Sequence, residues 1–329
     1  MVRTTPPRPV DLTAHLPELA PLARTAVRLH PRPGNPSTAD SSFGGPLLWP
    51  AAEPWPTCAE HVDSFVDGAS PANVVARRRI LTAAWARPRE EGADLLTAAE
   101  KVVLDSVSEE ERIFQEEPLP LVPVAQLYAR DVPGLPCPGG ADLLQVLWCP
   151  FDHEDEGCVP RTSLHWRVAA DVTDASAGAP HPALVDENYL PEACVLHPEE
   201  VTEYPAPLEL PRDLAARVRG WEEREGAQYQ YDLSVAPGCK VGGYGPWSFS
   251  DPFPLSCPDC GAAVGPLLTI ASGEWDGNRS WRPVEETDGA STIYPSPSEP
   301  TMVSIGRGYN LQLYTCVAAP GHRHVANMQ

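Results

Sequence analysis

The sequence predicts a β-rich α+β fold in which two pseudo-repeats of antiparallel sheet carry inserted helices and a zinc knuckle. Three observations carry this prediction: a segment rich in glycine, aromatic residues and proline occurs twice, short apolar runs bounded by proline or glycine recur along the chain, and stretches with helical periodicity interrupt the first repeat. The 329 residues suffice for one large core or two of ordinary size. We expect one compact unit, with an N-terminal half over residues 1–234 and a second pseudo-repeat over 235–329.

The repeated segment occupies residues 42–58 and 240–257. One gapless offset brings two Gly-Gly pairs, two aromatic positions and an acidic position into step. The matched residues are Gly44 with Gly242, Gly45 with Gly243, Trp49 with Trp247, Glu53 with Asp251, and Trp55 with Phe253. Farther along, the apolar run 144–149 resembles 311–316, and each run ends in a cysteine. We interpret the pattern as an internal duplication, with repeats near 25–160 and 235–329.

The first repeat is expected to begin with a strand near 25–30, where apolar residues alternate with polar ones. A helical insertion over about 70–117 follows, with apolar residues at helical spacing in 72–87 and again in 93–115. Gly92 lies between the two stretches, which favours a helical hairpin.

The chain after this insertion is expected to return to strands, at 121–128, 164–172 and 193–204. The connecting segment, about 161–234, also contains a helix that begins at Pro211. Its apolar residues Leu214, Val218 and Trp221 follow at i, i+4 and i+7, so they share one face.

The strongest chemical signal is a Cys-x2-Cys pair, Cys257 and Cys260, followed directly by Gly261. Cys316 and His322 lie near the C-terminus, and together the four side chains supply a tetrahedral Zn²⁺ site. His324 is the alternative fourth ligand. A thiol redox pair is the competing interpretation, but such a pair usually opens a helix, which the neighbouring prolines disfavour. Four protein ligands would leave the ion structural rather than catalytic.

A weaker echo of this pattern occurs in the first repeat. Cys58, His61, Cys149 and His153 occupy matching places, with Cys158 as a possible substitute. The alternative is that these are ordinary core cysteines and surface histidines. One zinc site is therefore expected and a second is possible.

The composition limits the partners that the protein can have. The formal net charge is −21 and the only basic run is Arg77–Arg79, so binding of nucleic acid through phosphates is not expected. No apolar run is long enough to cross a membrane, and the first residues lack the apolar segment of a secretory signal. These features predict a cytoplasmic protein, in which nine cysteines serve as free thiols or metal ligands rather than in disulfides.

The two Gly-Gly motifs and the aromatic residues beside them leave two interpretations open. Each motif is either a tight turn under a packed tryptophan or a cradle for a phosphate, and the aromatic residues form either core or a ligand groove. Lys240 adjoins the second motif and could hold an anion. No constellation for nucleophilic catalysis is present in the sequence.

The opening Gly-Gly-Pro-Leu-Leu-Trp-Pro at 44–50, the predicted strands at 126–127 and 144–145, and the second Gly-Gly motif together resemble the YwqG-like family of bacterial proteins, a domain of unknown function. The resemblance covers roughly 40–60 and 120–329. It implies a duplicated, β-rich α+β domain and brings no established catalytic residues. Some members are candidate immunity proteins of bacterial toxin systems.

Two functions are compatible with these observations. The first is a non-enzymatic zinc-binding protein that acts by binding another protein through its acidic surface, with a basic protein such as a toxin as one candidate partner. The second is an enzyme or small-ligand receptor with a site between the two pseudo-repeats, lined by Lys240, Trp247, Trp49 and Gln126.

Overall fold

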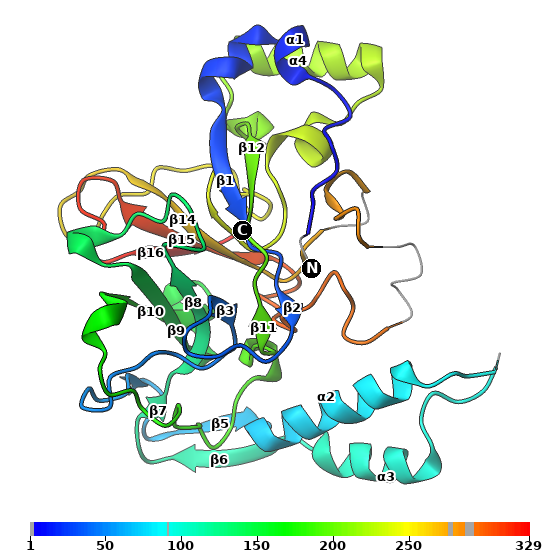
Figure 1. Cartoon of the computed structure of the whole chain (residues 1–329), viewed down its shortest axis with the longest axis vertical. Helices are drawn as coiled ribbons and strands as arrows, with labels where there is room; N and C mark the ends of the chain where they lie inside the picture. The colour runs from blue at the N-terminus through cyan, green and yellow to red at the C-terminus, as the bar shows by residue number, and fades with distance from the viewer. Residues whose placement is uncertain (1–2, 91, 276–278, 287–292) are drawn as a thin grey trace.

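The computed structural model describes residues 3–90, 92–275, 279–286 and 293–329 and confirms the β-rich α+β class. Two six-stranded antiparallel sheets form the middle of the molecule and contain twelve of the sixteen described strands (Figure 1). The first sheet has the order β10-β9-β8-β3-β11-β2, with strands Val159–Arg167, Leu143–His153, Val122–Tyr128, Ser42–Phe43, Cys194–Val195 and Arg32–Pro33. The second has the order β12-β1-β13-β14-β15-β16, with strands Glu199–Glu203, Arg24–Arg28, Lys240–Gly242, Val264–Ala271, Asn310–Cys316 and Val325–Met328.

The two sheets correspond strand by strand in their main parts. In each sheet, four strands lie side by side in the order in which they occur along the chain: β3-β8-β9-β10 in the first and β13-β14-β15-β16 in the second. Strands β4 to β7 come between β3 and β8 in the chain and lie outside the first sheet. The register shifts beside a proline in both second strands, after Pro123 in β8 and after Pro266 in β14. The duplication itself stays a prediction, and this matching order is the structural feature that it would account for.

A crossing ribbon, which the sequence patterns do not predict, joins the two sheets. Residues 24–33 run antiparallel to residues 194–203, with Arg24 opposite Glu203 at one end and Pro33 opposite Cys194 at the other. The first segment enters the second sheet as β1 and the first sheet as β2, whereas the other enters them as β12 and β11. Because β1 and β12 precede residue 234 in the chain, the second sheet draws strands from both predicted halves.

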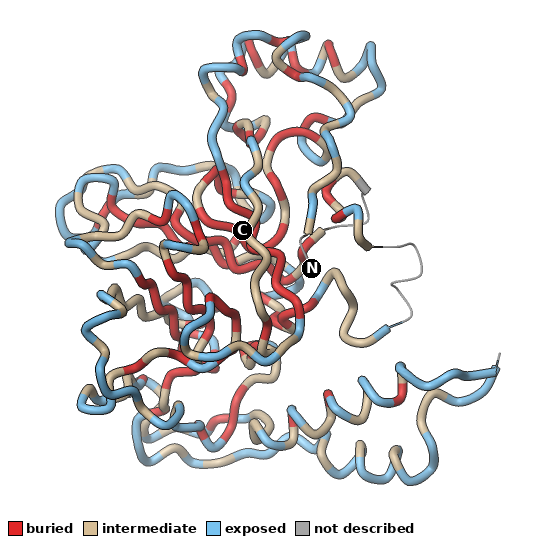
Figure 2. Tube along the Cα trace, viewed as in Figure 1, coloured by how far each residue is buried: buried red, intermediate tan, exposed pale blue. Residues whose placement is uncertain are grey.

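One hydrophobic core fills the space between the sheets. It contains buried side chains from β8 and β9 of the first sheet together with side chains from β14 and β15 of the second, such as Val124, Val146, Ile270 and Leu313. Figure 2 shows this burial concentrated along the central strands. Each such side chain contributes about 1.5–3 kcal/mol when it is buried. The shared core explains why the two sheets form one unit.

The predicted helix after Pro211 is α4, Arg212–Glu225. Its stripe of Leu214, Val218 and Trp221 packs against apolar residues of the N-terminal segment, which includes the short helix α1, Leu12–His15. This small cluster caps one end of the molecule (Figure 1).

The insertion forms an arm, defined here as residues 64–115, that extends along one edge of the molecule (Figure 1). It consists of β5 (Ser64–Gly68), α2 (Pro71–Ala86), α3 (Ala98–Val107) and β6 (Glu111–Gln115). A second small ribbon at its base pairs β4 (Thr57–Cys58) with β7 (Leu119–Pro120).

The predicted helix over 93–115 is wrong in its second part, because 111–115 forms β6. There Ile113 lies opposite Val66 and Phe114 lies opposite Phe65 in β5. The acidic run Glu109–Glu111 follows the helix, and negative charge at a helix C-terminus opposes the macrodipole. Strand pairing therefore wins where helical periodicity alone suggested a longer helix. Strand β10 likewise ends at Arg167, earlier than the predicted 172.

Among the described helices, none combines the length and apolar character needed to cross a lipid bilayer.

Candidate metal centres

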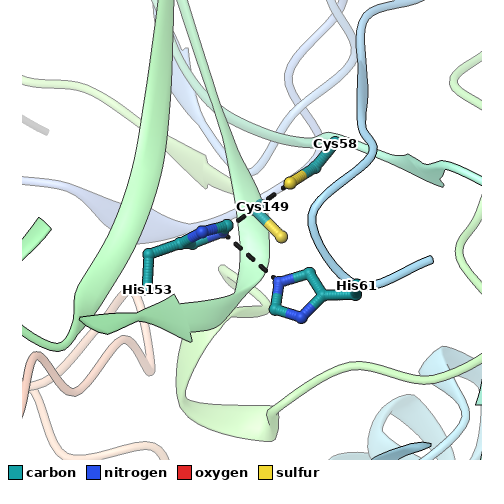
Figure 3. Close-up of side chains that lie close together, drawn as sticks. All are labelled: Cys58, His61, Cys149 and His153. Carbon is teal, nitrogen blue, oxygen red and sulfur yellow. Dashed lines mark hydrogen bonds between the residues drawn. The ribbon is translucent and has the colours of Figure 1, made fainter. Parts of the chain in front are cut away.

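The structure brings together both sets of ligands that the sequence predicts. The C-terminal cluster is Cys257, Cys260, Cys316 and His322, and the N-terminal cluster is Cys58, His61, Cys149 and His153. Within each cluster the four ligand atoms lie within 4.8 Å of one another. Figure 3 shows the four side chains of the N-terminal cluster pointing toward one another.

The C-terminal cluster is built from two loops beside strand β14. Gly261, at φ +71°, turns the chain after Cys260, and its N–H donates to the carbonyl oxygen of Cys257 at 2.9 Å. The N–H of Cys257 in turn donates to the carbonyl of Ala262 at 2.8 Å, which closes the knuckle. Cys316 ends strand β15, and His322 lies in the turn that leads to β16.

The N-terminal cluster is built from the base of the arm and from β9. Cys58 lies in β4, opposite Leu119 of β7, and His61 lies in the turn before β5. Cys149 and His153 both lie in β9, whose pairing with β10 is irregular between them, and both side chains point into the cluster (Figure 3).

Two of the six distances between ligand atoms in each cluster match the edges of a tetrahedron around one ion, and all six are within 4.8 Å. Bonds of about 2.3 Å to sulfur and about 2.05 Å to nitrogen give edges of about 3.8 Å for S–S, about 3.6 Å for S–N and about 3.3 Å for N–N. In the C-terminal cluster, Cys260 Sγ lies 3.6 Å from Cys316 Sγ, and Cys257 Sγ lies 3.5 Å from His322 Nδ1. In the N-terminal cluster, His153 Nε2 lies 3.7 Å from Cys58 Sγ and 3.4 Å from His61 Nε2. Both clusters could therefore hold a metal.

The surroundings lower the pKa of three of the five sulfurs, toward the thiolate form that binds metal, and raise the pKa of Cys149 and Cys260. Burial opposes ionisation of Cys257 and Cys316, but backbone N–H groups around each sulfur outweigh it and lower the pKa of both thiols. In the N-terminal cluster a hydrogen bond from the Cys149 thiol lowers the pKa of Cys58 to about 6, and the same bond raises the pKa of Cys149.

Sequence reasoning missed a carboxylate that supports the N-terminal cluster. Glu60 Oε2 lies 2.8 Å from His153 Nδ1, so that nitrogen donates its hydrogen to Glu60 and Nε2 is left to face the cluster. A carboxylate in this position typically orients a metal-binding histidine and raises its basicity. Arg161 holds Glu60 through an ion pair. The only signal in the sequence is that Glu60 lies within the Cys58-x2-His61 spacing.

The C-terminal cluster has an acidic residue, Asp259, at the position that matches Glu60, but Asp259 binds an arginine and not a histidine. Asp259 lies between Cys257 and Cys260 and accepts from the backbone N–H of Arg323 at 2.7 Å and from its Nε at 2.6 Å. These bonds, the backbone one foremost, lower the pKa of Asp259. Asp259 thus fastens one ligand loop to the other instead of supporting a histidine.

The two alternative ligands lie outside the clusters. His324 Nε2 lies 2.6 Å from Thr162 Oγ1, and burial lowers the pKa of His324 to about 4. With Arg323 between them, His322 faces the sulfurs and His324 faces β10, which selects His322 as the fourth ligand. Cys158 is exposed and contributes to neither four-residue cluster.

The Gly-Gly motifs are tight turns in the structure. Gly44 has φ +58°, and a Cβ there would lie 2.7 Å from the carbonyl oxygen of Glu192. At the second motif the carboxylate of Glu203 fills the turn, where it accepts from the N–H of Tyr244 at 2.8 Å and would collide with a Cβ on Gly243. A phosphate cradle at the second motif is therefore excluded, because an acidic side chain already occupies it.

The residues expected to line a site between the pseudo-repeats do not do so together. Lys240 is buried and paired with Glu203, and Trp49 and Gln126 are buried in the first half. Only Trp247 of this set borders a described cavity, of about 210 Å³. Trp49 instead packs on Trp55, with ring centroids 5.0 Å apart, as Trp247 packs on Phe253 at 5.7 Å.

No protein-family model matches the chain, and no curated protein matches it. The resemblance to the YwqG-like family therefore stays a prediction from the motifs.

Proposed function

We propose that this chain is a zinc-binding protein that acts by binding another protein and not by catalysis. The observation that carries the proposal is that four Cys and His ligand atoms meet within 4.8 Å in each cluster, with two distances in each that match the edges of a tetrahedron. Sets of two or three thiolates with imidazole suit Zn²⁺ better than the hard cations that prefer oxygen ligands. We therefore assign one Zn²⁺ to each cluster.

The closed ligand sets support a structural role for both ions. Four protein ligands leave no position for a substrate or an activated water. The N-terminal ion would join the base of the arm to β9, and the C-terminal ion would join the knuckle before β14 to the end of β15.

Zinc analysis of purified protein tests this assignment. We expect about two zinc ions per chain, and about one in either Cys58→Ser/Cys149→Ser or Cys257→Ser/Cys260→Ser. Cys137→Ser, which changes a thiol outside both clusters, is the matched control and should leave the content unchanged. Protein without zinc, or variants that all keep the wild-type content, would contradict the proposal. His61→Ala and His322→Ala provide the same test where a double cysteine variant does not fold.

The acidic surface supports a basic protein partner. A net charge of −21 attracts cationic surfaces over long range and repels anionic ones. Membership in the YwqG-like family, proposed from the motifs alone, would extend this to a role like that of a toxin-immunity protein.

A second candidate, a small-ligand receptor, is favoured by one cavity. A space of about 490 Å³ lies between β10 and the C-terminal ligand loop, with a wall from each of the two six-stranded sheets. Its polar lining includes Thr162, Ser163, Thr315, His322 and His324. A thermal-shift screen of metabolites tests this candidate. A ligand whose stabilisation is lost in Ser163→Leu would favour a receptor, and no stabilising metabolite would count against it.

A further inference from the structure

The arm departs from the correspondence between the two halves at the N-terminal metal cluster. In the second half, only residues 261–263 separate Cys260 from strand β14. In the first half the whole arm lies between His61 and β7. Both ends of the arm are held at the cluster. Ser64 Oγ donates to the carbonyl oxygen of His61 at 2.7 Å, and the N–H of Asp63 donates to the carbonyl oxygen of Gln115 at 2.8 Å. The arm is thus an addition placed on a ligand loop.

The inner helix of the arm is fixed to the body. Arg78 of α2 is buried, and its guanidinium donates to the carbonyl oxygens of Leu190 at 2.8 Å and Glu187 at 3.2 Å. Val74, one turn earlier, is buried in the shared core. Helix α2 therefore holds the rest of the arm at a set position.

The outer helix of the arm, α3, buries none of its residues. It is held by local bonds: a capping box between Thr97 and Glu100, the ion pair of Glu100 with Arg87, and that of Lys101 with Asp94. Helices of this length are marginal in water, and most gain their stability from packing an apolar face. In α3 the valines that could form such a face, Val102 and Val103, are 69% and 48% exposed.

Exposed apolar residues are concentrated on the arm. Of thirteen large apolar residues that are exposed in the described chain, five lie within these 52 residues: Phe65, Val75, Val102, Val103 and Phe114. Phe65 and Phe114, 60% and 47% exposed, stack edge to face across the ribbon with ring centroids 5.3 Å apart. Phe65 and Phe114 are thus an exposed apolar pair in contact, and contiguous exposed apolar groups typically mark an interaction site.

The charge of the arm decides what can cover it. Residues 88–115, the part of the arm beyond α2, contain eight acidic and three basic side chains, whereas residues 64–87 contain one acidic and four basic ones. Two of those four, Arg77 and Arg78, pair with Glu187 and Glu192 of the body, so the excess of negative charge lies on the outer part of the arm. A second copy that docked through the same face would bring like charges together, and an anionic surface would be repelled. A segment that is both basic and apolar would complement the acidic side chains and the exposed apolar residues of the arm.

We propose that the outer face of the arm is the docking surface for a basic, amphipathic segment of a partner protein. The inference rests on the proposed protein-binding function and names its surface and the chemistry of the partner. Apolar side chains of that segment cover Val102, Val103 and the Phe65–Phe114 pair, while its lysines and arginines face the surrounding carboxylates.

A peptide titration tests the docking surface. The probe is a fluorescent helical peptide of about 18 residues, five turns, with leucines on one face and lysines on the other. Controls are its scrambled form, which has the same charge but no apolar face, and a form with glutamate in place of lysine. We expect the amphipathic basic peptide to bind at least about tenfold more tightly than either control.

Matched protein variants locate the binding. Val102→Ser/Val103→Ser and Phe65→Ser should each weaken binding by at least about fivefold, because they remove apolar contacts from the docking surface. Leu208→Ser changes an equally exposed leucine outside the arm and should have no effect. Equal binding by wild type and arm variants, or equal affinity for the scrambled peptide, would overturn the inference.

Zinc content is measured on the same samples, so the two proposals can fail separately. Two zinc ions with no preference for the amphipathic peptide would overturn the docking surface and leave the zinc assignment standing. Binding that depends on the arm, in protein that never holds zinc, would do the reverse.

Discussion

The two candidate metal clusters share a plan but lie in different surroundings. The thiols of the N-terminal cluster belong to a hydrophobic cluster that also contains Trp49, Leu119 and Phe151. The thiols of the C-terminal cluster belong to none of the three hydrophobic clusters of the described residues, and Cys260 is exposed. Cys257 and Cys316 are buried, and Cys316 is the last residue of β15, but the knuckle and the turn after β15 meet there outside the hydrophobic clusters.

This difference separates two ways in which a metal stabilises a fold. At the N-terminal cluster, packing and the bond from His153 to Glu60 would keep the ligands near one another without an ion. At the C-terminal cluster, the Asp259–Arg323 pair is an exposed contact of the kind that contributes little. The ion should therefore carry more of the local order in the second half.

Removal of all zinc should have the largest effect. A structural zinc ion contributes several kcal/mol to folding, so two ions together should account for more than about 5 kcal/mol. We expect chelation to lower Tm by more than about 10 °C in thermal unfolding, and added Zn²⁺ to restore it. A chelated protein with unchanged Tm would mean that neither cluster binds metal structurally.

The separate loss of each site should reveal the difference between them. In hydrogen exchange, Cys257→Ser/Cys260→Ser should expose the backbone of 255–262 and 316–324 almost fully. Cys58→Ser/Cys149→Ser should cause a smaller increase, confined to the β4–β7 ribbon and the base of the arm, because apolar contacts remain. An equal increase at both sites would refute the difference drawn from their packing.

The sequence was sufficient to predict the candidate ligand residues, but not the ribbons and the carboxylate that surround them. The spacing of Cys257 and Cys260 alone predicts a metal site. The corresponding pair, Cys58 and His61, is found once the two Gly-Gly segments are aligned. The fold class followed from the same repeat. Ile113 was assigned to a helix because five residues of a ribbon offer too little alternation to outweigh helical periodicity nearby.

The crossing ribbon could not be predicted for a related reason. Strands β2 and β11 have two residues each, and their partners lie more than 150 positions away, so no local pattern marks them. One trace remains in the sequence, because Leu-His-Pro occurs at 29–31 and again at 196–198, in the middle of the two crossing segments. The role of Glu60 could not be predicted for the same reason, because it depends on the contact with His153 of β9, which lies 93 positions farther along the chain.

Substitution of the two matched acids should sharpen the comparison at the level of single side chains. Glu60→Ala removes the group that orients His153 and should lower zinc affinity of the N-terminal site by about 10–100-fold. Asp259→Ala, its counterpart, removes only a contact between loops and should change affinity at the C-terminal site by less than about fivefold. Competition with a chromophoric chelator, in variants that retain only the site under study, measures both. An effect of Asp259→Ala equal to that of Glu60→Ala would show that the two acids act alike.

Removal of the arm should have the smallest effect on the metal sites. Replacement of residues 62–118 by a single glycine joins His61 to Leu119 with the spacing that Gly261 provides between Cys260 and Ala262. Because the second half forms its knuckle without an insertion, the shortened protein should still hold about two zinc ions. Few residues of the arm are buried, among them Val66, Val74 and Arg78, so the loss of stability should be modest. Zinc analysis and thermal unfolding measure both effects. A shortened protein that folds but holds only one zinc ion would show that the arm completes the N-terminal site and is more than an attachment to it.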